Sequence, residues 1–309
     1  MDSEARPWPR LTTAYALHRT SSGRWSSGTD NTEVEKSRRR GKISQVQNIP
    51  KALRDMFVAD PGWRMVGGDW AAIQWALAMW RAAQINKPAG YHIDLLTKHQ
   101  TLGADGKPLL DPHLFLAQTW AGPEAGAEER QQSKPFTFGY LFYGTPQGIS
   151  WQTGIPVKKC EKVFEAWLEA FKLNWWWEHE LELALRRKFV ETAAGFRRYF
   201  LEPVARAKDG SLRTPKPTEI LAHAIQGDEA DLNKYVHVKI AEELGPEMRA
   251  PDLEWLTAVH DSSVWQAREA NAAARAQWLL SRMQMPVPFL GGRSWRAEVK
   301  VGESWKGVS

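Results

Sequence analysis

The strand-forming segments of this 309-residue chain lie near its two ends, and helix-forming segments fill the sequence between them. Residues 64–69 (RMVGGD) have the apolar character of a buried strand, and residues 255–266 read as two short strands joined by a turn. Amphipathic patterns with helical spacing recur between them, for example over residues 157–171 and 219–243. This distribution predicts an α+β protein in which strands distant in sequence meet in one sheet.

An aspartate stands at the end or turn of each of these strand-forming segments. Asp69 ends the first segment, and Asp261 lies in the turn of the second. Two carboxylates on converging strands can hold two Mg²⁺ ions about 3.5–4 Å apart, as two-metal phosphoryl transfer requires. Either aspartate alone is more often a turn or cap residue. The pair therefore indicates a metal site only in combination with residues that bind phosphate.

A helix predicted over residues 127–142, kinked at Pro135, supplies such residues. Arg130, Lys134 and Phe138 follow one another at intervals of four, so they share one helix face. Two cations and an aromatic ring on one face can bind a triphosphate and stack on a base. A solvated basic face with one buried ring is the alternative interpretation of the same spacing.

The composition is that of a globular protein with a modest excess of positive charge. Hydrophobic residues make up 43% and charged residues 25%, and the formal net charge of +5 is compatible with a nucleic-acid partner. Basic runs at 38–42, 186–188 and 197–198 either neutralise phosphates or face solvent. The single cysteine, Cys160, excludes an intramolecular disulfide and a cysteine-based zinc site. Together with the lack of a signal peptide or an apolar span, these features favour a cytoplasmic protein with no membrane partner.

The order of the motifs resembles that of the family A DNA polymerases, the group of bacterial polymerase I and many phage replicases. GGDWAAIQ at 67–74 resembles motif A, ERQQSKPFTFGYLFYG at 129–144 resembles motif B, and TAVHDSSVW at 257–265 resembles motif C. Further similar segments are SSGRWSS at 21–27, QNIP at 47–50, DPHLFLAQTWAG at 111–122, FVETAAGFRRYF at 189–200, IQGDEADLNK at 225–234 and VKVGESW at 299–305. The resemblance covers nearly the whole chain.

This resemblance implies a template-directed DNA polymerase, a nucleotidyltransferase that adds dNTPs to a primer 3′-hydroxyl by two-metal-ion phosphoryl transfer. Asp69, Asp261 and the backbone carbonyl of Trp70 would hold two Mg²⁺ ions. Primer–template DNA and dNTPs would be the partners. Two alternatives stay open: a non-catalytic or weakly catalytic nucleic-acid-binding subunit of a split replicase, and an enzyme related to the single-subunit RNA polymerases.

The resemblance also assigns roles to other motif residues. Lys134 would bind the triphosphate and protonate the pyrophosphate that leaves. The other residues expected to contact the nucleotide are Arg130, Phe138, His113, Gln74 and Tyr143. Those expected to contact the DNA are Arg24, Gln226 and His260, together with Arg38, Arg39 and Arg40 in an unusually long basic loop.

Three features depart from the family's pattern. Gln74 stands where the family has the motif A glutamate that excludes ribose, and Ser262 replaces the second acid of motif C. Motif B has one extra residue before Gly144, so its second aromatic residue is Phe142 by count or Tyr143 by its place beside the glycine. We favour Tyr143.

The implied fold is a right-hand polymerase with a palm built on a small antiparallel sheet, helical fingers and no thumb. The expected bounds are 1–75 for the first part of the palm with a remnant of the thumb base, 76–210 for the fingers, and 211–309 for the second part of the palm. Because thumb and 3′–5′ exonuclease domains usually precede the first motif, we expect either a separate protein that supplies these functions or a strongly distributive enzyme.

Overall fold

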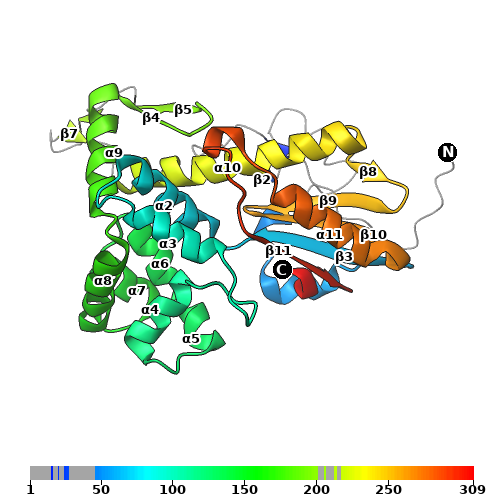
Figure 1. Ribbon diagram of the computed structural model, residues 1–309, viewed down its shortest axis with the longest axis horizontal. Helices are drawn as coiled ribbons and strands as arrows, with labels where there is room; N and C mark the ends of the chain where they lie inside the picture. Colours follow the sequence, from blue (N-terminus) through cyan, green and yellow to red (C-terminus); the bar gives the residue numbers. More distant parts are fainter. Residues whose placement is uncertain are drawn as a thin grey trace. The chain divides into compact units, whose positions relative to one another are not determined.

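The computed structural model describes residues 15–16, 20, 24–27, 46–200, 205–206, 212–213 and 217–309 (Figure 1). Arg38, Arg39 and Arg40 lie outside the described residues. The chain divides into two compact units, of which the first combines Met1–Ala71 with Glu229–Ser309 and the second is Ala72–Asp228. The long helix α10 (Pro217–Leu244) contributes its first turns to the second unit and the rest to the first.

The first unit is built around a five-stranded antiparallel sheet with the strand order β11-β3-β10-β9-β8. β3 lies between β10 and β11, although the whole second unit separates it from both of them in sequence. The prediction that the segments of Asp69 and Asp261 meet in one sheet is thus confirmed. The strands are β3 (Trp63–Trp70), β8 (Arg249–Ala250), β9 (Leu253–Val259), β10 (Ser262–Arg268) and β11 (Ala297–Gly302).

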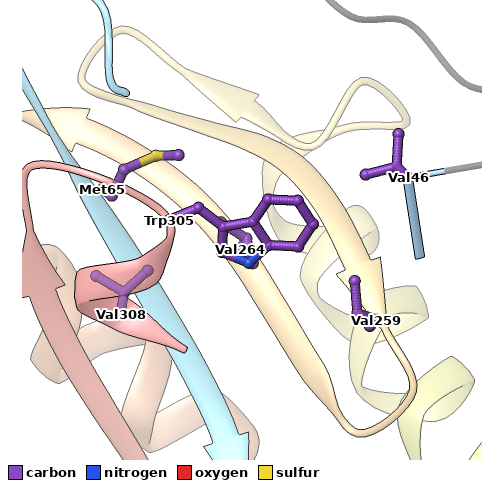
Figure 2. Close-up of a cluster of buried hydrophobic side chains, with 6 residues drawn as sticks. All are labelled: Val46, Met65, Val259, Val264, Trp305 and Val308. Carbon is purple, nitrogen blue, oxygen red and sulfur yellow. The ribbon is translucent and has the colours of Figure 1, made fainter. Parts of the chain in front are cut away.

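Both faces of β3 are covered at close range. Helix α11 (Ala272–Met283) packs on one face of the sheet (Figure 1), where the side chain of Met283 lies against Gly68. On the other face Val308 of η5 (Lys306–Val308) lies against Gly67. Figure 2 shows the apolar cluster of the second face, which consists of Val46, Met65, Val259, Val264, Trp305 and Val308. Since successive strand residues point to opposite faces, Asp69 shares its face with Gly67.

Short elements complete the first unit. The hairpin of β1 (Tyr15–Ala16) and β2 (Ser26–Ser27) is anchored on the main sheet, where the Tyr15 hydroxyl donates to the carbonyl of Ala258 at 2.9 Å. The remaining elements are 3₁₀ turns: η1 (Val46–Asn48), η2 (Lys51–Met56), η3 (Glu269–Asn271) and η4 (Pro288–Leu290).

The second unit is mainly helical, and large aromatic side chains fill its core. Trp167 stacks on Trp177 with a centroid distance of 5.4 Å, and Trp75 and Phe171 are fully buried beside other rings. Among the described residues, no helix combines the length and apolar character that crossing a bilayer requires. The elements are α2 (Ile73–Ile85), α3 (Tyr91–Gln100), α4 (Pro112–Ala121), α5 (Ala127–Gln132), α6 (Lys134–Leu141), α7 (Pro146–Thr153), α8 (Val157–Phe171), α9 (Asn174–Arg187), β4 (Phe189–Glu191), β5 (Arg197–Tyr199), β6 (Ala205–Arg206) and β7 (Leu212–Arg213).

Motif B forms two helices where the sequence predicts one kinked helix. α5 ends and α6 begins at Ser133, two residues before Pro135. Proline has no N–H to donate to the preceding turn, which weakens a continuous helix at this point. The hydroxyl of Ser133 contacts the carbonyl oxygens of His113 and Arg130 at 2.5 and 2.8 Å, which fixes the break against α4.

Candidate active site

The two predicted metal ligands come together at one end of the sheet. Asp69 is the last residue but one of β3, and Asp261 immediately precedes β10. In the antiparallel register Asp69 lies opposite Ser262, so Asp261 is one residue removed from that pair. Asp69 is exposed and Asp261 is partly exposed, as carboxylates that bind ions from solvent must be.

A further carboxylate lies beside this pair. Glu298 of β11 is opposite Asp69, on the flank that faces away from Ser262. Directly opposed residues of antiparallel strands share a face, with Cβ atoms roughly 4.5–5.5 Å apart. Arg296 donates to Glu298 at 3.3 Å and offsets part of its charge. Glu298 was not predicted, because local sequence gives no register between β3 and β11.

The turn between β9 and β10 has a left-handed residue at its first position. His260 has φ 55°, and the carbonyl of this residue accepts a hydrogen bond of 2.6 Å from Nδ2 of Asn233 in α10. The hydroxyl of Ser262 donates to the carbonyl of Val259 at 2.9 Å across the same turn. The backbone that precedes Asp261 is therefore held at two carbonyls by side-chain hydrogen bonds.

Two of the predicted DNA-binding residues line one small pocket beside this turn. Arg24 forms an ion pair with the buried carboxylate of Glu229. Burial lowers the pKa of His260, and Arg24 lowers it further against the opposing effect of Asp261, so this imidazole is neutral near pH 7. The complete lining is Arg24, Trp25, Gln47, Ala230, Asn233, Ala258 and His260.

The predicted triphosphate-binding residues also lie close to one another, on α4, α5 and α6 of the second unit. Nε of Arg130 donates to Asp111 at 2.7 Å. Asp111 caps α4 by accepting from the backbone N–H groups of His113 and Leu114. The ring of Phe138 lies 5.6 Å from that of His113. Asp111 was missed as a site residue, although an aspartate directly before a proline is a recognisable helix start.

The electrostatics of this group assign different roles to its members. Burial lowers the pKa of His113 to about 3, and the lowering effects of Arg130 and Lys134 add to it, while Asp111 opposes it. His113 is therefore a neutral hydrogen-bonding group. Burial alone would raise the pKa of Asp111, but the N–H of Leu114 and the guanidinium of Arg130 outweigh it and lower the pKa. The positive charge of the site comes from Arg130 and Lys134.

The remaining predicted site residues lie on separate elements. Gln74 is half-buried in the first turn of α2, and Gln226 is half-buried on α10, one turn before Glu229. Tyr143, with φ 65°, is 44% exposed and packs its ring 5.2 Å from that of Trp177. The indole of Trp70 is buried and donates to the carbonyl of Met283, and its backbone pairs with Ala297 of β11.

The two aspartates at the sheet end are the kind of ligand set that magnesium uses in phosphoryl-transfer sites. Such a site does not need a closed cage of protein ligands. Within the described part of the chain, no group of three or more His, Cys, Asp or Glu side chains is arranged to hold a metal ion. Magnesium in phosphoryl-transfer sites is usually bound by one or two carboxylates, with substrate phosphates and waters as the other ligands. Asp69 and Asp261, side by side at the sheet end, match that pattern.

The fold is that of a polymerase domain. The POL domain of Pol1 from M. smegmatis, solved in complex with DNA primer-template and dNTP, matches this chain with a TM-score of 0.71 at 21% sequence identity. The match covers 96% of this chain and 48% of that chain. The sequence model of DNA polymerase family A matches residues 5–307, and the chain belongs to this family.

Bacterial polymerases are among its relatives. The thermostable DNA polymerase I of Thermus aquaticus is 28% identical over 309 residues, and the DNA polymerase I of Rhizobium leguminosarum is 23% identical over 305 residues. Each alignment covers 96% of this chain but only 32% and 27% of the respective relative. The family resemblance inferred from the motifs is confirmed, and the chain corresponds to about a third of the length of these relatives.

Proposed function

We propose that this chain is a template-directed DNA polymerase core that adds dNTPs to a primer 3′-hydroxyl. The observation that carries the proposal is that Asp69 of β3 pairs with Ser262, the residue directly after Asp261, in a member of family A. The names of the relatives and the primer-template and dNTP bound to the M. smegmatis domain support the same reaction.

In this proposal the sheet holds the reaction centre. Asp69, Asp261 and the backbone carbonyl of Trp70 would hold two Mg²⁺ ions at the end of β3. Such ions would supply a lower pKa for the primer hydroxyl and positive charge for the phosphates. The contribution of the chain is rigidity, because β3 is paired on both sides and packed on both faces, so the carboxylates need little reorganisation.

The helical unit binds the incoming nucleotide. Arg130 and Lys134 pair with the triphosphate, and Lys134 supplies the proton that the pyrophosphate takes up. Phe138 stacks on the base. Nδ1 of His113 is engaged with the hydroxyl of Thr137 at 2.9 Å, so Nε2 is the nitrogen for a phosphate contact. Gln74 retains most of the bulk of glutamate and keeps the steric exclusion of ribose, and Tyr143 takes the second aromatic role of motif B.

DNA contacts complete the proposal. Arg24 and Gln226 donate to the minor-groove acceptors that every correct base pair presents, and His260 supports the primer end. The ion pair with buried Glu229 holds the guanidinium of Arg24 in place. Arg38, Arg39 and Arg40 bind duplex phosphates, and the chain either works with a separate protein that supplies thumb or exonuclease functions or is strongly distributive alone.

Extension of a labelled primer by the purified chain tests the function directly. We expect template-directed extension with dNTPs and Mg²⁺, little with rNTPs, and none after chelation. Asp69→Asn and Asp261→Asn should each lower the rate at least about 100-fold, because each removes a metal charge at the reaction centre. Primer–template binding, measured by fluorescence anisotropy, should persist in both variants.

Asp55→Asn is the matched control, since Asp55 is a half-exposed aspartate of the same unit whose ion pair with Lys306 lies on the surface. It should extend primers at the wild-type rate. A wild-type chain that binds primer–template but never extends it would favour the non-catalytic alternative. Equal use of rNTPs and dNTPs would favour the RNA polymerase alternative.

A further inference from the structure

Helix α10 holds the turn that carries Asp261 through two side chains, Asn233 and His237. Asn233 donates from Nδ2 to the carbonyl of His260 at 2.6 Å. One turn later on the helix, Nε2 of His237 lies 2.9 Å from the hydroxyl of Ser263. Asp261 therefore lies between two contacts from one rigid element.

The first contact acts on a strained residue. A φ of 55° places His260 in the left-handed region, which β-hairpin turns exploit but which residues other than glycine, asparagine and aspartate seldom adopt. A hydrogen bond to the carbonyl of His260 stabilises that conformation from outside the turn. Replacing Asn233 would leave the peptide before Asp261 with no such support from α10.

Among the described residues, only one end of the buried Asn233 amide has a hydrogen-bond partner, and stability alone does not favour this arrangement. Its side chain is only 5% exposed, and a carbonyl acceptor at 2.6 Å requires the amide nitrogen to face His260. Among the described residues, the other amide atom, Oδ1, has no hydrogen-bond partner. A buried amide that satisfies only one of its ends costs free energy, and such residues are characteristic of functional sites.

The second contact, between His237 and Ser263, is buried, and the hydrogen bonds of His237 determine its tautomer. Nδ1 of His237 lies 2.8 Å from the carbonyl of Asn233, so Nδ1 carries the hydrogen and Nε2 accepts from Ser263. The Ser263 oxygen accepts in turn from Nε1 of Trp265 at 2.8 Å. The rings of Trp25 and Trp255 pack on His237 with centroid distances of 5.1 and 5.9 Å.

We propose that Asn233 is a positioning residue for Asp261, with His237 as a second anchor on the strand that follows. This inference rests on the proposed function and assigns a residue that sets the geometry of the same site. In this proposal Asn233 acts by fixing the peptide that leads into Asp261, through its hydrogen bond to the carbonyl of His260, and not by contact with nucleotide or metal. Its loss changes metal binding and turnover, while nucleotide affinity and global stability stay unchanged.

Asn233→Leu removes the donor but keeps the branched skeleton of four side-chain heavy atoms, and Asn233→Gln retains an amide donor on a longer arm. We expect Asn233→Leu to lower kcat by about 10- to 100-fold, the usual effect of losing a residue that orients a metal ligand. KM for dNTP and the unfolding midpoint should match the wild type, and Asn233→Gln should recover part of kcat. Lys239→Ala, which alters an exposed residue of the same helix, is the control and should behave as wild type.

Direct Mn²⁺ binding, followed by the electron paramagnetic resonance of free Mn²⁺, is the second readout. Asn233→Leu should weaken Mn²⁺ binding by about tenfold without any turnover. A wild-type chain that fails to extend primers would refute the proposed function, while Mn²⁺ binding would still decide the role of Asn233. A folded Asn233→Leu variant with wild-type kcat and Mn²⁺ affinity would overturn the positioning role. If Asn233→Leu does not fold, Asn233→Ala replaces it, with the same two outcomes.

Discussion

His113 is the residue whose surroundings define its role most narrowly. A pKa of about 3 keeps its imidazole neutral at physiological pH, so it adds no charge to those of Arg130 and Lys134. A neutral imidazole can donate to a phosphate only from a nitrogen that carries hydrogen. Since Nδ1 faces Thr137, a donating Nε2 requires the threonine hydroxyl to donate to Nδ1. The same hydroxyl lies 3.5 Å from the carbonyl of Ser133, a competing acceptor, so the direction of the Thr137 hydrogen bond would set the His113 tautomer.

Thr137→Val tests this selection, because it removes the hydroxyl and keeps the shape of a fully buried side chain. A lost hydrogen bond of about 1 kcal/mol should raise KM for dNTP roughly fivefold, with kcat little changed. Single-turnover kinetics separate the two quantities. Thr119→Val, at an exposed position of α4, should leave both unchanged. An unaltered KM in Thr137→Val would show that the His113 tautomer does not matter for binding.

The depressed pKa of His113 also predicts how stability depends on pH. The unfolded chain takes up a proton near the ordinary histidine pKa of about 6.5, whereas the folded chain resists protonation down to about 3. The contribution of His113 to the free energy of unfolding is complete above pH 6.5. It is lost as pH falls towards 3, by up to about 1.4 kcal/mol per pH unit. Denaturant unfolding at pH 7, 6 and 5 should show a shallower decline in His113→Gln. The exposed His179→Gln variant should follow the wild type, and identical slopes in all three would contradict the assignment.

At the scale of elements, the close packing of β3 depends on its two glycines, Gly67 and Gly68, because neither position has free space for a side chain. An added Cβ at Gly67 would collide with the backbone of Val308, whereas one at Gly68 would meet the flexible end of Met283. Gly67→Ala should therefore lower the free energy of unfolding by about 1–3 kcal/mol, and Gly68→Ala by less. Chemical denaturation of both variants measures the difference. The two substitutions control for each other, because the added methyl group is the same, and a reversed order would contradict the packing.

Local pattern predicted the long elements well and the long-range pairings poorly. α8 has the predicted bounds because its apolar stripe is regular from Val157 to Phe171. Helix α7 was not predicted, since Gly144, Pro146 and Gly148 obscure the cap signal of Thr145, whose hydroxyl accepts from the N–H of Gly148. Helix α3 was also not predicted. Propensity alone does not distinguish a turn from the proline-led start of a helix.

In the candidate site, too, residues with a local sequence signal could be predicted and residues defined by long-range contacts could not. Asp69 and Asp261 could be found from the sequence because each follows a recognisable strand and matches a family motif. Glu229, Asn233 and His237 could not, since polar residues within α10 read as a solvated face until the sheet is placed against it. Their partners lie up to 205 residues away in sequence, as the bond between Arg24 and Glu229 illustrates. Such contacts depend on tertiary structure.

At the scale of the whole molecule, the proposed binding of DNA would depend on electrostatics. The formal net charge is only +5, and the cation predicted to read the minor groove, Arg24, already shares its charge with buried Glu229. In the proposed complex, phosphate contacts would come mainly from other basic residues, and Arg38, Arg39 and Arg40 belong to the most basic stretch of the sequence, 38–42. These three lie outside the described residues, and only their charge enters the prediction that follows.

Replacing Arg38, Arg39 and Arg40 together with glutamine should weaken primer–template binding and flatten its salt dependence. If all three contact phosphates, the slope of log K against log salt should fall by about 2.7, at roughly 0.9 per contact on duplex DNA. Anisotropy titrations between about 50 and 200 mM salt measure this slope. Lys158, Lys159 and Lys162 of α8, exposed and changed to glutamine, give a control with the same loss of net charge.

The same prediction extends to processivity, the number of nucleotides added per encounter, which is measured with a trap that captures dissociated enzyme. Because the formal net charge is only +5, we expect the chain alone to add only a short stretch per encounter at about 150 mM salt, where exposed charges are screened beyond about 8 Å. The arginine-to-glutamine variant should add fewer still, and the α8 control as many as the wild type. Extension by hundreds of nucleotides per encounter would remove the reason for a partner that supplies a thumb. Equal processivity of both triple variants would show that net charge alone retains the DNA, without specific contacts from Arg38, Arg39 and Arg40.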